Sequence, residues 1–239
     1  MKLATREWGS GDRTLAIVHG INGSSALWNS FASLLVERHK IRVIAVDLRG
    51  HGLSARSTSY VLDDFVGDLV DTLPHAPDIL LGHSLGGRIV HSAVPLLQPT
   101  RAIYLDPGFS VTLPTFVQRA PGLNALLGRT LAISAPGVPL ADRATKRETT
   151  RQWHRWMSRQ IVLDMVARPV PIAPPVVPST VLLSHRSPLV PARYAEQLRG
   201  VGWDIHTLDR AKHDMYLLEP ARTLDALDDF LRVANEPSL

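Results

Sequence analysis

The sequence predicts an α/β fold, with a mostly parallel central sheet, helices on both faces and a small helical cap. Short apolar runs rich in valine, isoleucine and leucine alternate with segments of helical length, a pattern typical of βαβ units. The runs end in polar residues or glycine, as buried parallel strands do. The chain of 239 residues is 45% apolar and 20% charged, which is enough for one sizeable core and unlike a disordered or fibrous chain.

The expected strands and helices follow one another along the chain. Buried parallel strands are expected at residues 15–18, 42–46, 79–81, 102–105 and 181–183. Helices are expected between them, near residues 25–37, 63–73, 85–97 and 192–199. A last strand at 204–208 precedes a terminal helix from about 220 to 232. Because connections of this kind are right-handed, helices should cover both faces of the sheet.

Residues 109–178 break this alternation. They contain no convincing strand, but helical stretches are expected around 122–131 and 143–165. The segment ends in the proline-dense run ARPVPIAPPVVPST, which can form neither a helix nor a central strand. We therefore expect a core of residues 1–108 and 179–239, with 109–178 inserted as a helical cap that returns through a stiff, extended arm.

Composition and charge exclude several classes of protein. The absence of cysteine excludes disulfides, thiolate metal sites and cysteine nucleophiles. The net charge of +4 could suggest a nucleic-acid partner, but no zinc-finger, RRM or KH pattern is present, and a solvated helix face explains the basic cluster at 143–159. Neither a signal-peptide apolar region nor a membrane-length apolar stretch occurs. We expect a soluble cytoplasmic protein.

The motif with the clearest chemistry is G-H-S-L-G at residues 82–86. It follows an apolar strand and opens a helical segment, the context that the nucleophile elbow G-x-S-x-G requires. A serine at such a turn stands at the carboxyl edge of the sheet, over a helix N-terminus that favours developing negative charge. Ser84 is therefore the candidate nucleophile; the alternative is a glycine-rich structural turn.

A second glycine-rich turn, H-G-I-N-G at residues 19–23, directly follows the first buried strand. The backbone N–H groups of Ile21 and Leu85 are candidate donors of an oxyanion hole, and Asn22 is a candidate substrate contact. The alternative is a plain turn between a strand and a helix.

The run D-L-R-G-H-G-L-S at residues 47–54 follows the next strand. With the two glycine-rich motifs, in this order and at these spacings, the chain resembles the α/β-hydrolase fold superfamily over nearly its whole length. The resemblance implies that this run is mainly scaffold, with structural roles for Asp47, Arg49 and His51. It also implies the chain order of nucleophile, acid and histidine.

That order favours His213 as the catalytic base among the ten histidines. It lies five residues beyond the last expected strand, and the surrounding KHDMYLLEP resembles the histidine loop of the superfamily. The alternative is an ordinary loop histidine.

The acid departs from the pattern of the superfamily, which usually carries Asp in a G-x-x-D-x-x-V-P turn. Here the turn reads S-H-R-S-P-L-V-P, so Ser187 occupies the acid position and cannot supply the negative charge. Asp106 is the best substitute, because certain dehalogenases and lactonases of this superfamily carry their acid at the end of the same strand. Asp209, Asp214 or the lack of a charged third member are the alternatives.

Apolar side chains of the expected cap are candidates for substrate contact. Trp153, Trp156 and Met157 would share one face of a continuous helix, and Trp28 follows the oxyanion turn. Each of these side chains either lines an apolar pocket or only packs the cap and the sheet together. No phosphate-binding loop, dinucleotide fingerprint or H-E-x-x-H spacing is present, so no cofactor and no metal are expected.

The sequence thus predicts a cofactor-independent serine hydrolase that cleaves an apolar carboxylic ester or lactone of moderate size through an acyl-enzyme. Other chemistries of the superfamily stay open: carbon–carbon bond hydrolysis, thioester hydrolysis, perhydrolysis and hydroxynitrile cleavage. A non-hydrolytic small-molecule binder is the alternative from a different class, motivated by Ser187.

Overall fold

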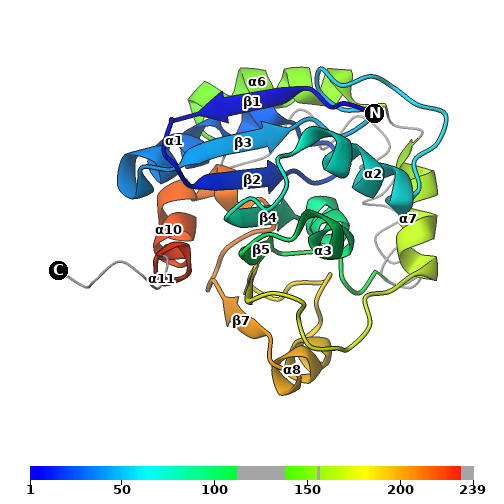
Figure 1. The fold of residues 1–239 in the computed structure, drawn as a ribbon, viewed down its shortest axis with the longest axis vertical. Helices are drawn as coiled ribbons and strands as arrows, with labels where there is room; N and C mark the ends of the chain where they lie inside the picture. The colour runs from blue at the N-terminus through cyan, green and yellow to red at the C-terminus, as the bar shows by residue number, and fades with distance from the viewer. Residues whose placement is uncertain (112–137, 155–156, 233–239) are drawn as a thin grey trace.

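A computed structural model of the chain describes residues 1–111, 138–154 and 157–232 (Figure 1). In this part of the chain one seven-stranded sheet has the order β1-β3-β2-β4-β5-β6-β7. Only the edge strand β1 runs antiparallel to its neighbour, and the other neighbouring strands are parallel. The predicted mostly parallel sheet is confirmed. The predicted helix around 122–131 lies outside the described residues.

The predicted strands are confirmed to within two residues at each end. The strands are β1 Thr5–Trp8, β2 Thr14–Val18, β3 Arg42–Val46, β4 Ile79–His83, β5 Arg101–Leu105, β6 Ser179–Leu183 and β7 Asp204–Thr207. The sequence analysis missed β1, because this edge strand is mostly exposed and has no apolar run to identify it.

The described helical elements are η1 Ser25–Trp28, α1 Asn29–His39, α2 Leu62–Thr72, α3 Leu85–Leu97, α6 Leu140–Gln152, α7 Met157–Ala167, α8 Ala192–Gly200, α9 Met215–Leu218, α10 Pro220–Asp225 and α11 Asp228–Leu231. The single terminal helix predicted at 220–232 is wrong in detail. It is divided into α10 and α11, because the backbone at Leu227 departs from regular α-helical geometry.

Alternate residues of each central strand belong to two separate cores. In β2, for example, Ala16 and Val18 pack with residues of α2, α3, α7 and α8, whereas Leu15 and Ile17 pack with residues of α1, α9 and α10. This alternation follows from the period of two residues in a strand. The prediction of helices on both faces of the sheet is confirmed, and Figure 1 shows α2 and α3 together on one side.

Helices α6 and α7 lie between β5 and β6 along the chain, within the predicted cap. The continuous helix predicted at 143–165 is wrong, because α6 ends at Gln152 and Trp153 is extended, with φ −70° and ψ 127°. The N–H of His154 donates to the Gly50 carbonyl (2.8 Å), and α7 begins only at Met157. Residues 168–178 form neither helix nor strand, as the proline-dense run predicts.

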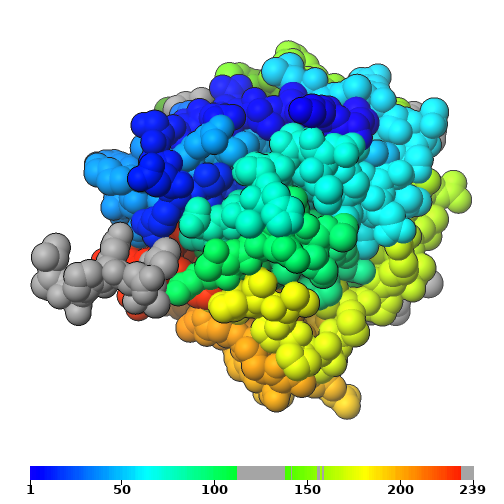
Figure 2. Space-filling model, in the orientation of Figure 1, coloured from blue at the N-terminus to red at the C-terminus, as the bar shows by residue number. Residues whose placement is uncertain are grey.

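On the face shown in Figure 2, segments that follow one another along the chain lie side by side. They run from β1 through α2 and α3 to the proline-dense segment 168–178 and α8. Among the described residues, no helix is both long and apolar enough to cross a bilayer.

Candidate active site

Ser84 occupies a sharp turn between β4 and α3. Its φ of 54° and ψ of −116° lie outside the regions that most residues adopt, and such a conformation costs about 1–3 kcal/mol. The Ser84 N–H donates to the Leu105 carbonyl (3.0 Å), which ties the turn to the end of β5. This is the strand–turn–helix geometry that the G-x-S-x-G motif predicts.

The glycines that flank Ser84 lie where no side chain fits. A Cβ on Gly86 would lie 2.1 Å from the Val18 carbonyl oxygen, and one on Gly82 would lie 2.5 Å from the Gly86 carbonyl oxygen. Both obstacles are backbone atoms of packed elements and cannot rotate away. The turn therefore requires glycine on both sides of the serine.

Gly86→Ala should lower the free energy of unfolding by roughly 1–3 kcal/mol, because the new methyl group overpacks the contact between α3 and β2. The measurement is urea denaturation followed by circular dichroism. Gly67→Ala is the matched control: nothing lies within 4 Å of its Cβ position on α2, and it should stabilise the protein by about 0.5–1 kcal/mol. Equal effects at the two positions would contradict the packing argument.

Asp106 and His213 are in direct contact. Asp106 directly follows β5 and has a φ of 41°. Its side chain is fully buried, and its Oδ2 accepts a hydrogen bond from Nδ1 of His213 at 2.6 Å. The N–H and Oγ of Ser184 also donate to the carboxylate, at 3.2 and 2.8 Å. Burial by itself would raise the pKa of Asp106, but His213 and the serine hydroxyls outweigh it and lower this pKa to about 2. The buried carboxylate is therefore ionised at neutral pH.

The two other candidate acids pair with other histidines. Asp209 pairs with Nδ1 of His185 at 3.1 Å, and the Asp209 side chain is 70% exposed. Oδ1 of Asp214 lies 3.8 Å from Nε2 of His83. Ser187 accepts hydrogen bonds from the N–H groups of Leu189 and Val190 (3.3 and 3.2 Å), and its hydroxyl helps to lower the pKa of Asp106. Of the three candidate acids, Asp106 is the one that directly contacts the imidazole of His213.

The turn after β2, which carries the expected oxyanion donor Ile21, is held in place by hydrogen bonds to the Gly20 carbonyl and packs against Ser84. The carbonyl of Gly20 belongs to the same peptide unit and accepts hydrogen bonds from Nδ1 of His19 (2.7 Å) and from the Gly23 N–H (3.1 Å). In a trans peptide the N–H points opposite to the carbonyl, so the two hydrogen bonds to the Gly20 carbonyl also fix the direction of the Ile21 N–H. A Cβ on Gly20 would lie 2.9 Å from Cβ of Ser84, which shows how closely the turn packs on the serine.

His19 thus has a positioning role that the sequence analysis did not assign to it. Its Nε2 accepts the Leu48 N–H at 3.0 Å, so the ring links the ends of β2 and β3. Burial lowers the pKa of His19, and the neutral ring can donate through one nitrogen and accept through the other. Leu85, the other expected oxyanion donor, is the first residue of α3 and is buried.

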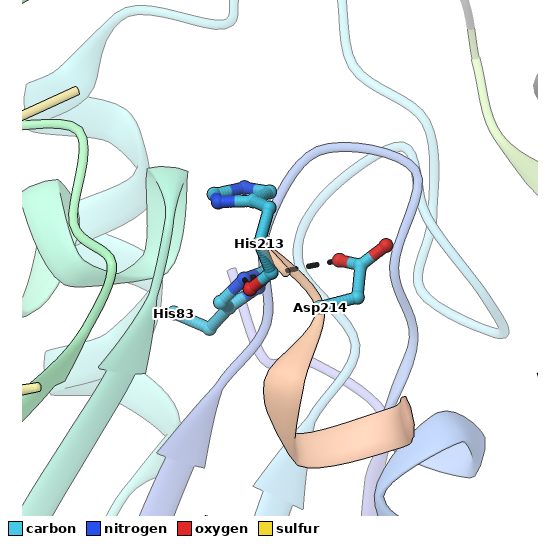
Figure 3. A group of neighbouring side chains, drawn as sticks. All are labelled: His83, His213 and Asp214. Atoms are coloured by element: carbon cyan, nitrogen blue, oxygen red, sulfur yellow. Dashed lines mark hydrogen bonds and ion pairs between the residues drawn. The ribbon is translucent and has the colours of Figure 1, made fainter. Parts of the chain in front are cut away.

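His83 supports the loop that carries His213 (Figure 3). Its Nε2 donates to the His213 carbonyl at 3.1 Å, and the centroids of the two rings lie 4.6 Å apart. Burial and the neighbouring His213 lower the pKa of His83 to about 3. Donor atoms of His83, His213 and Asp214 lie within 4.8 Å of one another, a spacing that metal ligands also have. A metal bound through Nε2 of His83 would break the bond that holds the loop.

The apolar candidates for substrate contact are deeply packed. Trp28 is fully buried, stacks on Tyr216 at 3.7 Å and lies edge-on to His83 at 6.4 Å, so it supports the site from within the core. Trp153 and Met157 are also buried in the core. The expected helical face that they would share is wrong, because Trp153 lies outside α6 and Met157 begins α7. Trp156 lies outside the described residues.

Two residues near the site were missed from sequence. A Cβ on Gly108 would lie 2.4 Å from Cε of Met165, and the Gly108 N–H donates to the Ser84 carbonyl, so this α7 side chain approaches the nucleophile turn. Nζ of Lys146, on α6, donates to the Asn22 carbonyl at 3.1 Å. No local motif marks either residue, because both contacts join segments that are distant in sequence.

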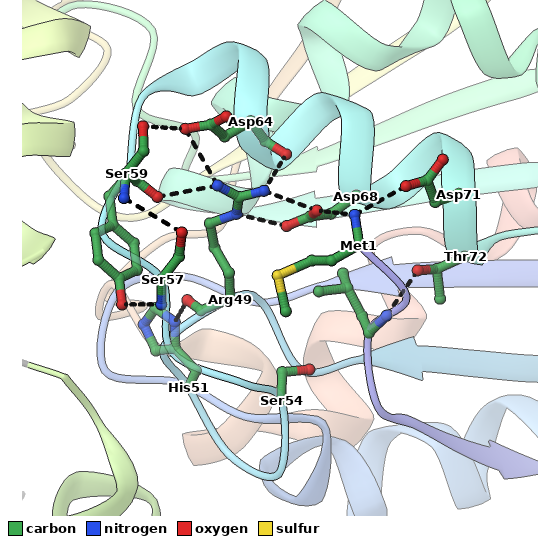
Figure 4. A network of polar contacts seen from close by, with 12 residues as sticks. Met1, Arg49, His51, Ser54, Ser57, Ser59, Asp64, Asp68, Asp71 and Thr72 are labelled. Carbon is green, nitrogen blue, oxygen red and sulfur yellow. Dashed lines mark hydrogen bonds and ion pairs between the residues drawn. The ribbon is translucent and has the colours of Figure 1, made fainter.

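The D-L-R-G-H-G-L-S run is engaged in internal bonds, which agrees with the expected scaffold role (Figure 4). Asp47 accepts the Ser25 and Leu53 N–H groups at 2.6 and 2.9 Å and so fixes the segment after the oxyanion turn. Arg49 forms a bidentate ion pair with buried Asp68, at 2.6 and 2.8 Å. Nδ1 of His51 lies 3.1 Å from the Arg49 carbonyl.

Residues 15–226, which include every candidate catalytic residue, match the alpha/beta hydrolase family. The chain belongs to this family.

Curated members of the alpha/beta hydrolase family match parts of the chain. An sn-1-specific diacylglycerol lipase of Danio rerio is 34% identical over 111 residues, which cover 44% of this chain and 35% of the lipase. A 2-(acetamidomethylene)succinate hydrolase of Mesorhizobium japonicum is 43% identical over 90 residues, or 36% of this chain and 31% of that protein. The chain thus spans about a third of the length of these curated relatives.

A solved structure of E-2-(acetamidomethylene)succinate hydrolase aligns with a TM-score of 0.78 and 24% identity. The alignment covers 96% of this chain and 94% of the hydrolase. At this identity the likeness shows the fold, and the chemistry has to be argued from the site.

Proposed function

We propose that the protein is a cofactor-independent serine hydrolase that cleaves a carboxylic ester or lactone through an acyl-enzyme. The single observation that carries the proposal is the 2.6 Å bond between Asp106 and His213, at the sheet edge where Ser84 occupies its strained turn. A buried carboxylate that holds the imidazole through Nδ1 leaves Nε2 as the acceptor nitrogen, which is the tautomer that a base needs.

In the proposed reaction, Oγ of Ser84 attacks the carbonyl carbon while Nε2 of His213 takes the hydroxyl proton. The N–H groups of Ile21 and Leu85 bind the oxyanion of the tetrahedral intermediate. Its collapse breaks the bond to the alcohol oxygen, which leaves with the proton from His213. A water molecule then gives a proton to His213, attacks the acyl-enzyme and releases the acid, and the proton returns to Ser84.

The test is the intact mass of the protein after treatment with a fluorophosphonate probe. We expect one adduct on the native protein and none on Ser84→Ala, because only a serine activated by its base attacks phosphorus rapidly. Circular dichroism of both proteins verifies that they are folded. A folded native protein that gains no adduct would overturn the proposal and favour a non-hydrolytic binder, which predicts thermal stabilisation by a ligand without turnover.

A further inference from the structure

Lys146 is a cation held against the oxyanion turn by the segment between β5 and β6. Its Nζ donates to the carbonyl of Asn22, the residue that follows the proposed oxyanion donor Ile21. One helical turn further along α6, the Thr149 hydroxyl bonds the Ser24 hydroxyl at 2.8 Å. These two contacts fix α6 over residues 22–24 and leave the ammonium little freedom to move away.

The charge of Lys146 has no contacting anion among the described residues. Its hydrogen bond to Asn22 uses one of three N–H donors. Asp214 is the acidic group that acts on it most directly, but no ion pair within 4.0 Å joins the two in the described part of the chain. Burial lowers the pKa of Lys146. Burying an ammonium without a contacting anion costs free energy, and an anion that contacts the ammonium lowers this cost.

The residue whose carbonyl accepts from this ammonium also carries a polar side-chain atom without a partner among the described residues. The Asn22 side-chain oxygen is buried and accepts no hydrogen bond within the described residues. Because the oxygen and nitrogen of an amide exchange places on rotation, the same side chain can present its N–H₂ group to an acceptor. A group that accepts from both Lys146 and Asn22 would satisfy both side chains. A carboxylate has this capacity.

We propose that Lys146 and Asn22 form a recognition site for a carboxylate on the substrate, close to the scissile carbonyl. The favoured substrates are then esters of a dicarboxylic acid whose second carboxylate is free, rather than wholly apolar esters. This inference rests on the proposed function and deepens it. The ammonium contacts the residue next to Ile21, so a carboxylate a few bonds from the oxyanion can reach it.

The test compares two substrates that share one scissile 4-nitrophenyl ester: mono-4-nitrophenyl glutarate, whose second carboxylate is free, and its methyl ester, in which a methyl group replaces the negative charge. Lys146→Met keeps the length of the side chain and removes its charge. We expect it to lower kcat/KM for the anionic ester by about 10- to 100-fold, the range for a lost charge-assisted hydrogen bond. The neutral ester should change less than about 3-fold. Lys146→Arg should keep the preference for the anionic ester.

Arg147→Met is the matched control, because it removes the same charge from the next residue of α6, whose side chain is exposed. It should leave both substrates nearly unchanged. An equal loss on both esters in Lys146→Met would overturn the proposal, since Lys146 would then only support the oxyanion turn. No loss on either ester would also overturn it.

A binding measurement separates this proposal from the hydrolytic one. Isothermal titration of the Ser84→Ala protein with glutarate should show binding that weakens at least about 10-fold when Lys146→Met is added, but not when Arg147→Met is added. Lys146-dependent binding without turnover of either ester would support recognition while the proposed hydrolysis fails. Turnover that depends on Ser84, without any binding of glutarate, would overturn recognition alone.

Discussion

Asp106→Asn should lower kcat/KM for a 4-nitrophenyl ester by about 10⁴-fold while the protein stays folded. The asparagine amide can donate to Nδ1 of His213, whereas the aspartate accepts from it at 2.6 Å. The imidazole would then carry its proton on Nε2, on the side of the ring away from the new amide, and could not take the proton of Ser84. The loss of the buried negative charge also removes the stabilisation of the imidazolium that forms during attack.

Two further variants identify Asp106 as the source of this effect. Ser187→Ala removes a hydroxyl that helps to lower the pKa of Asp106 and leaves the carboxylate in place, so its activity should fall less than about 10-fold. Ser187→Asp in the Asp106→Asn background should restore part of the activity, because Ser187 occupies the position where the superfamily usually carries its acid. A loss for Asp106→Asn of less than about 10-fold would exclude Asp106 as the triad acid.

The sheet and the nucleophile turn could be predicted from sequence because both are local signals. Strands buried on both faces appear as uninterrupted apolar runs, and β2 to β6 all have this character. The strand β1 carries no such run, since it is an edge strand of the sheet that the described residues form and its residues are mostly exposed. Its antiparallel pairing with β3 depends on hydrogen bonds between backbones, which the side chains do not encode.

The sequence favoured Asp106 as the acid but kept Asp209 and Asp214 as alternatives, because the contact that distinguishes Asp106 joins residues 107 positions apart. The Val190-Pro191 pair places Ser187 where the superfamily usually carries its acid, so the acid had to be sought among three other aspartates. The end of β5 and the loop after β7 meet only once the order of the strands is fixed. The break between α6 and α7 has a similar origin, since the His154 N–H bonds the distant carbonyl of Gly50.

Removing one partner of the buried ion pair between Arg49 and Asp68 should strongly destabilise the fold. Both side chains are buried, with exposed fractions of 9% and 1%, and the guanidinium bonds both carboxylate oxygens. Arg49 also donates to the carbonyls of Ser59 and Asp64, at 2.9 and 3.1 Å. The pair therefore ties the loop after β3 to α2 (Figure 4).

Asp68→Ala should lower the free energy of unfolding by about 3–5 kcal/mol, because it removes both carboxylate oxygens that bond the buried Arg49 guanidinium. Among the described residues, only the more exposed Asp64 carboxylate, 3.1 Å from the guanidinium, would then balance this charge. Asp71→Ala is the control from the same helix: its side chain is 55% exposed, and its pairing with the N-terminal amine should contribute less than about 1 kcal/mol. Urea denaturation with an unchanged slope would measure both values. If the two variants lowered the free energy of unfolding by similar amounts, burial of the ion pair would not explain the cost of breaking it. A large loss confined to Asp68→Ala would show that Arg49, in the loop after β3, stabilises the scaffold through its pair with α2.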